Sequence, residues 1–247
     1  MRKKVINEVE RIYGRLPKKP KHLYLEIIKE EEYGCGDGKL YYEHKITAEY
    51  DKGFFSFNIR SIMPADTQRC ILIYVGCDKK STGSTTPCEK IANIGYRTVS
   101  LCLKELFDKK HDKSSLVKLA CNRQKKWIPG RLMLCAYAAG LVADCIRYEH
   151  PGRPIYIVGD CTMGEAVILG AVMAENIDVC LINEEPLCEE SPDLYCREYN
   201  SEYTVEERIE ILKGAMRDKI VIYRDNDLSA ALQEVNSENM CAQKSYC

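Results

Sequence analysis

One short stretch, residues 155–166, constrains the fold of this chain more than any other. It begins with a run of β-branched and aromatic residues that ends on Gly159. Cys161 follows two residues later, and an apolar, helix-compatible segment then runs from residue 166 to residue 174. This order predicts a buried strand, a sharp turn and a helix, which together hold a nucleophilic side chain above a sheet and beside the amino end of a helix.

Strand-like and helix-like segments alternate along the chain from about residue 68 onward. The strand-like runs are 70–75, 96–103, 154–158, 177–183 and 218–223. The helix-like segments are 87–93, 132–148, 165–175, 205–217 and 228–235. This alternation predicts an α/β fold of three layers, α/β/α, in which helices cover both faces of a mostly parallel sheet.

The beginning of the chain has a different pattern. A short amphipathic helix is predicted over 3–16, and strands are predicted over 22–32, 40–50 and 54–62. Turn residues between these strands favour an antiparallel amino-terminal meander. We expect a single domain over 1–247, with the helix and antiparallel strands in 1–66, the parallel α/β core in 67–235 and a tail in 236–247.

The composition indicates a soluble globular protein. Hydrophobic residues make up 45% of the 247 residues and charged residues 30%, and the formal net charge is -1. This balance of charge gives no reason to expect a nucleic-acid partner. The basic start of the chain has no apolar core after it, and no apolar run approaches the roughly 18 residues that span a bilayer. We therefore expect no membrane partner and a cytoplasmic location.

Cysteine is frequent, with 14 residues, but no Cys-x-x-Cys pair occurs. The sequence therefore implies no metal site and no cofactor. Free cysteine packs as a small hydrophobe, and its frequent use favours a reducing compartment. Five cysteines fall inside predicted strands or helices: Cys70, Cys102, Cys135, Cys145 and Cys180.

Chemistry in a parallel sheet gathers beyond the carboxyl ends of its strands. Cys161 follows the strand over 154–158, and the amino end of the next helix favours its thiolate form. The backbone N–H of Thr162, with that of Gly76 or Cys77, is the predicted pair of donors to a developing oxyanion. The alternative is that Cys161 is one more small filler among the cysteines.

The order of these segments resembles the α/β-hydrolase fold, and more narrowly the carbohydrate-esterase branch that contains acetyl xylan esterases and glucuronoyl esterases. Residues 87–96 (PCEKIANIGY) are similar to the P-x-E-x-I-A-x-x-G-Y entry to the fourth strand of that group. Residues 132–146 resemble the helix with small residues before the nucleophile strand, and 159–164 (GDCTMG) resemble G-H-S-R-x-G. Residues 183–188 resemble the loop after the sixth strand. The likeness extends over roughly 22–235.

The resemblance implies a hydrolase of carboxylic esters, small or carbohydrate-linked, with a single α/β-hydrolase-like domain and Cys161 as nucleophile. Cysteine also serves in the related dienelactone hydrolases. The acid is Glu184, at the place where glucuronoyl esterases carry theirs, or a carboxylate after the last strand, Asp225 or Asp227. Glu165 and Thr162 replace the Lys and Arg that flank the nucleophile in glucuronoyl esterases, which argues against a uronate substrate.

The general base is the one catalytic residue for which the sequence offers no clear candidate after Cys161. The fold orders its residues as nucleophile, acid and histidine, but the four histidines (His22, His44, His111 and His150) all precede Cys161. His111 lies in the long loop over 104–131, on the correct side of the predicted sheet, and is the candidate base. His150 is expected at the opposite end of the nucleophile strand, roughly 20 Å away.

Three interpretations follow. The first is an ester hydrolase that acts on a small-molecule ester, with the missing histidine explained by degeneration, by truncation or by a base from another chain. The second is a catalytically inactive protein of hydrolase fold that binds a ligand or a protein. The third is a nucleotide-binding domain, since residues 76–86 are rich in Gly, Ser and Thr. That segment lacks the G-x-x-x-x-G-K-[ST] spacing of a phosphate-binding loop. The sequence leaves the oligomeric state open.

Overall fold

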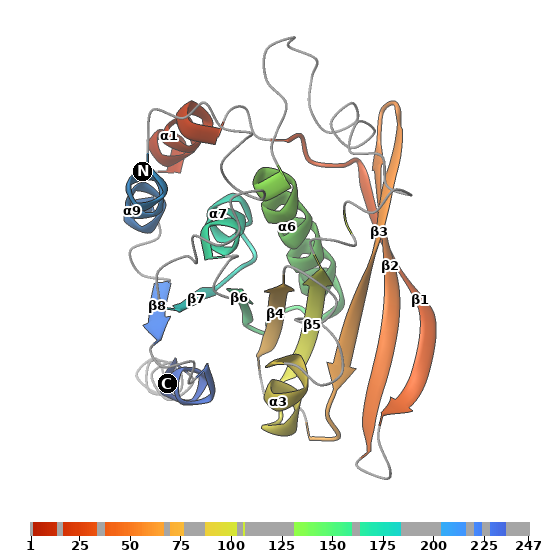
Figure 1. Cartoon of the computed structure of the whole chain (residues 1–247). Coiled ribbons are helices and arrows are strands. Elements are labelled where there is room, and N and C mark those ends of the chain that lie inside the picture. Colours follow the sequence, from red (N-terminus) through yellow and green to blue (C-terminus); the bar gives the residue numbers. More distant parts are fainter. Residues whose placement is uncertain are drawn as a thin grey trace.

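The structure, a computed structural model, places eight strands in one mixed sheet with the order β1-β2-β3-β5-β4-β6-β7-β8 (Figure 1). It describes residues 2–13, 17–33, 38–66, 70–76, 87–102, 106, 131–159, 164–183, 204–215, 220–223 and 228–235. The strands are β1 (His22–Tyr33), β2 (Lys39–Tyr50), β3 (Gly53–Met63), β4 (Ile71–Gly76), β5 (Arg97–Cys102), β6 (Ile155–Gly159), β7 (Val179–Asn183) and β8 (Ile220–Tyr223). The labelled helices are α1 (Arg2–Tyr13), α3 (Pro87–Asn93), α6 (Arg131–Glu149), α7 (Gly164–Met173) and α9 (Val205–Ala215). A further helix runs over 228–235.

The first three strands form the predicted antiparallel meander. Strands β2 and β3 pair along their whole length, from Tyr50 opposite Gly53 to Leu40 opposite Met63. Gly53 has φ of 145°, a backbone conformation that glycine adopts without the steric cost of a Cβ. Strand β1 pairs with β2, and its register shifts at a bulge between Ile27 and Lys29.

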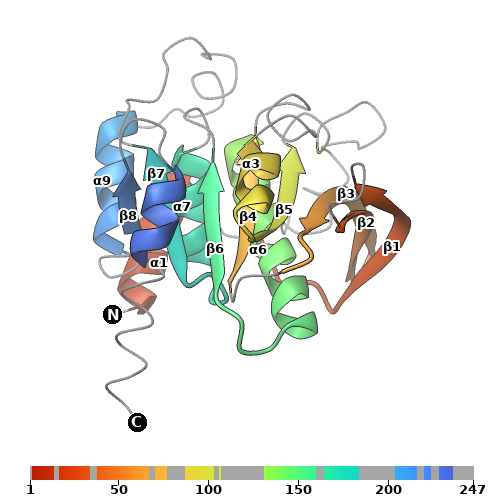
Figure 2. The same ribbon diagram turned by 90° about the horizontal axis from the view of Figure 1, so that it is seen from below.

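The other five strands are parallel to one another, as the alternating sequence pattern predicts. In Figure 2 the arrowheads of β4, β5 and β6 point toward the same edge of the sheet. The meander joins this parallel part where β3 pairs antiparallel with β5, with Ser61 opposite Val99. The α/β fold class with an antiparallel amino-terminal meander is therefore confirmed.

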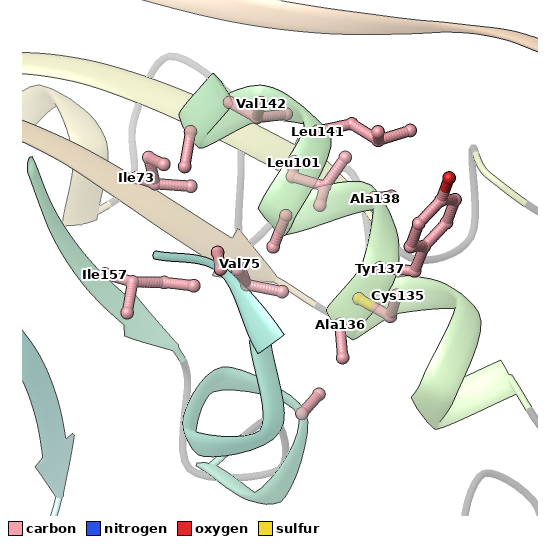
Figure 3. Packing of buried hydrophobic residues seen from close by; sticks show 14 of the residues in the cluster. Ile73, Val75, Leu101, Cys135, Ala136, Tyr137, Ala138, Leu141, Val142 and Ile157 are labelled. Carbon is pink, nitrogen blue, oxygen red and sulfur yellow. The ribbon is translucent and has the colours of Figure 1, made fainter. Parts of the chain in front are cut away.

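Two apolar clusters lie on the two faces of the sheet, which makes the three layers. The larger cluster packs α1, α6, α7 and α9 against one face, and the smaller packs α3 and the helix over 228–235 against the other (Figure 1). In Figure 3 the sheet residues Ile73, Val75 and Leu101 lie beside α6. A fully buried aliphatic side chain contributes about 1.5–3 kcal/mol, so these two layers account for much of the stability.

Helices α6 and α7 pack closely because small residues line their contact. A Cβ added to Gly170 of α7 would lie 3.2 Å from the carbonyl oxygen of Ala136 in α6, which is too close for an unstrained contact. A hydrogen bond also holds the carboxyl end of α6 to the segment after α7, since Asn176 donates to Asp144 at 2.6 Å. The position of α7 relative to the sheet is therefore fixed by its packing on α6.

The cysteine prediction is largely confirmed within the described ranges. Every cysteine there is buried and forms no disulfide: Cys70, Cys88, Cys102, Cys135, Cys145 and Cys180. Cys70 differs in one detail, because it precedes β4 instead of lying inside the strand. In the described part of the chain, no helix has the length and apolar character needed to cross a bilayer.

Candidate functional site

The strands that lead to the predicted catalytic residues end side by side at one edge of the sheet. Gly76 ends β4 and is buried, and the residue before it, Val75, pairs with Gly159, the last residue of β6. Asn183 ends β7 opposite Tyr223, the last residue of β8. We call this the carboxyl edge. The register therefore brings together the points from which the predicted site segments leave the sheet.

Most of the predicted site residues themselves lie outside the described ranges. This is true of the nucleophile Cys161, the acids Glu184, Asp225 and Asp227, and the candidate base His111. It is also true of Thr162 and Cys77, two of the predicted oxyanion donors. Gly76 is the only predicted site residue inside the described ranges, where it is opposite Cys102 of β5.

The elements on either side of Cys161 have the predicted form. Every residue of β6 is buried, and α7 begins at Gly164, so residues 160–163 connect a buried strand directly to a buried helix. The first eight residues of α7, Gly164 to Ala171, are all buried. Four residues therefore separate the two elements, and the residues on both sides of them, Gly159 and Gly164, are buried.

The first turn of α7 carries a buried carboxylate, that of Glu165. Its side chain has no solvent exposure, and its Oε1 accepts a 2.6 Å hydrogen bond from the Tyr13 hydroxyl of α1. Arg208 of α9, 5% exposed, donates from Nε to Oε1 at 2.6 Å and from Nη2 to Oε2 at 3.2 Å. Two parallel N–H···O bonds of this kind form the strong, directional pairing that guanidinium favours with a carboxylate.

The ion pair stabilises the charged form of Arg208. Burial lowers the pKa of Arg208, but its hydrogen bond and charge interaction with Glu165, with a contribution from Tyr13, outweigh burial and raise the pKa above its ordinary value. The negative charge of Glu165 also lies at the amino end of α7, where the helix dipole favours it. The network joins α1 and α9 to the first turn of α7, which begins three residues after Cys161 in the sequence.

The sequence interpretation placed Glu165 beside the nucleophile but did not find its partners. Arg208 lies 43 residues further along the chain, so no local spacing links the two. Each helix did carry a sequence feature that points to a buried charge. Glu165 is the only charged residue of α7, and Arg208 shares with Leu212 the helix face that points into the protein.

Helix α9 begins with a reciprocal cap, which fixes the turn that holds Arg208. The backbone N–H of Thr204 donates to Oε2 of Glu207 at 2.8 Å, and the backbone N–H of Glu207 donates to Oγ1 of Thr204 at 3.2 Å. This is the capping-box arrangement, which satisfies two donors at a helix start.

The described histidines lie far from the carboxyl end of β6, the strand that precedes Cys161 in the sequence. His150 follows α6 at the opposite, amino edge of the sheet, as predicted, where it contacts Arg97. His44 lies within β2, four strands from β6, and His22 opens β1, five strands away. At about 4.8 Å per strand, these two are roughly 19 and 24 Å from β6 across the sheet.

His44 is buried in a way that keeps it neutral. Its Nε2 lies 2.9 Å from Oγ of Ser61, and its ring stacks on Tyr42 with 5.6 Å between centroids. Burial, helped by the charge of Arg97, lowers the pKa of His44 to about 4. A neutral, enclosed imidazole on the meander, four strands from β6, is not placed to act as a base for Cys161.

Other chemistry is limited in the described part of the chain. No group of three or more His, Cys, Asp or Glu side chains there is arranged to hold a metal ion. Cys145 and Cys88 are poor nucleophiles, because burial, with the nearby carboxylates of Glu149 and Asp144, raises the pKa of Cys145 to about 12, and burial raises that of Cys88 to about 12 as well.

Comparison with known proteins rests on structure, because no protein-family model and no curated protein matches the sequence. A glucuronoyl esterase from Solibacter usitatus superposes with a TM-score of 0.65 at 14% identity, over 90% of this chain and 73% of that one. A promiscuous esterase of carbohydrate esterase family 15 from a marine bacterial metagenome gives 0.61 at 12% identity, over 92% and 73%. A glucuronoyl esterase of the same family from Teredinibacter turnerae gives 0.53 at 15% identity, over 74% and 50%.

Identities this low establish the fold alone. The chain spans about three quarters of the length of the first two esterases and half of the third. The eight-stranded mixed sheet, the helices on both of its faces and these superpositions agree with the motifs read from the sequence. The chain adopts the α/β-hydrolase fold, and its structural neighbours are esterases of the glucuronoyl esterase type.

Proposed function

We propose that the chain hydrolyses carboxylic esters, small or carbohydrate-linked, with Cys161 as its nucleophile. The observation that carries this proposal is the register of β4, β6 and β7, whose carboxyl ends meet at the edge from which Cys161 and its predicted partners leave the sheet. The structural neighbours at this fold are esterases, which supports the same reaction class.

The proposed reaction proceeds through a thioester. The Cys161 thiolate attacks the ester carbonyl carbon, and the oxyanion that forms is stabilised by the backbone N–H of Thr162 with that of Gly76 or Cys77. Collapse of this intermediate breaks the bond to the alcohol, which leaves with a proton. Water then hydrolyses the thioester to release the acid and restore the thiol.

Proton transfer in this scheme falls to His111, oriented by Glu184 or by a carboxylate after β8, Asp225 or Asp227. Removal of one member of a nucleophile–base–acid set typically lowers kcat by several orders of magnitude, while the oxyanion donors sustain a residual rate. His111→Ala is therefore expected to lower turnover at least 100-fold if His111 is the base. An unchanged rate in this variant would assign the proton transfer to another group.

The substrate is expected to be a neutral ester and not a uronate ester. Glu165 is paired with Arg208 inside the protein, so α7 does not offer a cation at this position to a carboxylate of the substrate. Structural neighbours of this chain are named for glucuronoyl esters, which makes the comparison of a neutral and a uronate ester informative. We expect higher kcat/KM for p-nitrophenyl acetate than for a methyl glucuronate ester.

The decisive variant is Cys161→Ala, assayed with p-nitrophenyl acetate. We expect turnover in the wild type and a loss of at least 100-fold in Cys161→Ala. Cys145→Ala is the matched control, since Cys145 is buried in α6 and is expected to leave the rate unchanged. Equal rates for the wild type and Cys161→Ala would remove the proposal.

A second function has a specific observation behind it. No histidine follows Cys161 in the sequence, and the described histidines are far from the carboxyl end of β6 across or along the sheet. A catalytically inactive binding protein of this fold would show a Cys161 thiol no more reactive to iodoacetamide at pH 7 than that of Cys145. Residue-resolved mass spectrometry of the alkylated protein distinguishes the two functions.

A further inference from the structure

Arg208 and Arg97 are both buried, at 5% and 8% exposure, but their surroundings differ. Arg208 places Nε and Nη2 on the two oxygens of Glu165. Arg97 contacts Nε2 of His150 through Nη1, whereas its buried Nε has no hydrogen-bond partner. Within the described ranges no carboxylate forms an ion pair with Arg97. A guanidinium carries five N–H donors and no acceptor, so the surroundings of Arg97 are short of acceptors.

A second buried nitrogen without a partner lies on the same side of the sheet. Arg97 opens β5 two residues before Val99, which packs in the core beneath α6, so both side chains face α6. His44, 4% exposed, binds Ser61 through Nε2, but its buried Nδ1 has no hydrogen-bond partner. When the Ser61 hydroxyl donates to Nε2, Nδ1 carries the ring proton and is a second donor without an acceptor.

Charges of both signs act on these donors. The charge of Arg153 acts on Arg97, in addition to that of Arg97 on His44. Glu149 is the acid whose charge acts on Arg97, but its carboxylate lies 3.8 Å from His150 and its side chain is 40% exposed. The His150 side chain is 29% exposed, so the group borders solvent.

We propose that Tyr42, His44, Ser61, Arg97 and His150, the Arg97 cluster, bind a small oxyanion, either a carboxylate or a phosphate group. The oxyanion accepts hydrogen bonds from Nε and the adjacent Nη of Arg97, in the same side-on geometry that Arg208 uses on Glu165. The Nδ1–H of His44 is a further donor. A buried cation is costly without a partner, and the anion supplies one.

This site is separate from the proposed catalytic edge. Arg97 lies opposite Ile71, the first residue of β4, whereas Gly76 ends that strand. Six residues of strand are about 20 Å long, so an anion at Arg97 does not contact an ester at Cys161. The inference therefore stands or falls independently of the esterase proposal.

The test compares thermal unfolding in sodium phosphate and in sodium acetate with unfolding in sodium chloride of equal ionic strength. We expect phosphate or acetate to raise Tm by about 3 °C when its concentration is about ten times Kd. The anion that does so identifies the ligand as a tetrahedral or a planar oxyanion. Arg97→Met is expected to lose the effect, while Lys52→Gln, which removes a cation from the exposed β2–β3 turn, keeps it.

Two further measurements keep the test decisive. Glu149→Gln removes the competing carboxylate and is expected to tighten binding of the anion about threefold. If Arg97→Met does not fold, ring signals of the histidines in the wild type are followed by NMR during the titration. Signals of His44 and His150 are expected to shift, and that of the exposed His22 to stay. The inference is overturned if neither anion raises Tm beyond chloride and no histidine signal moves, or if Arg97→Met responds like the wild type.

Discussion

The two buried arginines show how differently one fold can treat the same side chain. Beside the carboxyl edge, Arg208 meets a carboxylate of its own chain, and the pair holds α1, α7 and α9 together. At the amino edge, Arg97 meets a histidine nitrogen and no carboxylate among the described residues. A cation that the chain neutralises itself serves the structure, whereas a cation left short of acceptors is suited to bind a ligand. The predictions below separate these two roles.

The largest effect is expected when Arg208 is removed. Arg208→Met leaves the fully buried carboxylate of Glu165 without its cation, which typically costs about 3–5 kcal/mol. In Glu165→Leu/Arg208→Met the charges are removed together, so most of that loss should be recovered. Urea unfolding measures both variants. If Arg208→Met lost less than about 1 kcal/mol, the pair would not be the structural element that the comparison makes it.

The next largest effect is a loss of stability at low pH, which we expect from protonation of His44. The folded pKa of His44, about 4, lies below its ordinary value of 6.5, because burial and Arg97 disfavour the charged ring. The contribution of neutral His44 to the free energy of unfolding is therefore fully present above pH 6.5. It is lost as the pH falls toward 4, and the loss is about 3 kcal/mol at most. His150 has a pKa lowered in the same direction, first by burial. His44→Gln should flatten this part of the curve of unfolding free energy against pH.

A smaller effect is expected from the cap of the helix that carries Arg208. Thr204→Ala removes the Thr204 side chain from the capping box of α9 and should cost about 1 kcal/mol in urea unfolding. Lys213→Ala, which breaks the solvent-facing ion pair with Glu210 on the same helix, should cost less than about 0.5 kcal/mol. A larger loss for the Lys213 variant than for the Thr204 variant would show that surface charge, and not the start of α9, fixes the position of Arg208.

Much of the fold could be predicted from the sequence because it depends on local patterns. The run before Gly159 is apolar along its whole length, which is typical of a parallel strand covered on both faces, and the structure places it there as β6. The helix over 87–93 and the hairpin around Gly53 follow from periodicity and turn residues in the same way.

The contacts of the two buried arginines could not be predicted, because they join residues far apart in sequence. Glu165 and Arg208 are 43 residues apart, and Arg97 and His150 are 53 apart. Each pair depends on strand register and helix packing, which a single sequence specifies only through the complete fold. For the catalytic residues, the sequence and the fold agree on where β6 and α7 lie, and the roles of Cys161, His111 and Glu184 stay predictions.

Acylation of Cys161 is the most direct test of the proposed chemistry. The wild type is mixed with p-nitrophenyl acetate, quenched in acid after less than one turnover and digested, and each cysteine is examined for an added acetyl group by mass spectrometry. The thioester mechanism predicts acetyl on Cys161 first, together with a burst of p-nitrophenol equal to the enzyme concentration. Hydrolysis without acetyl on Cys161, or acetyl spread evenly over the cysteines, would contradict it.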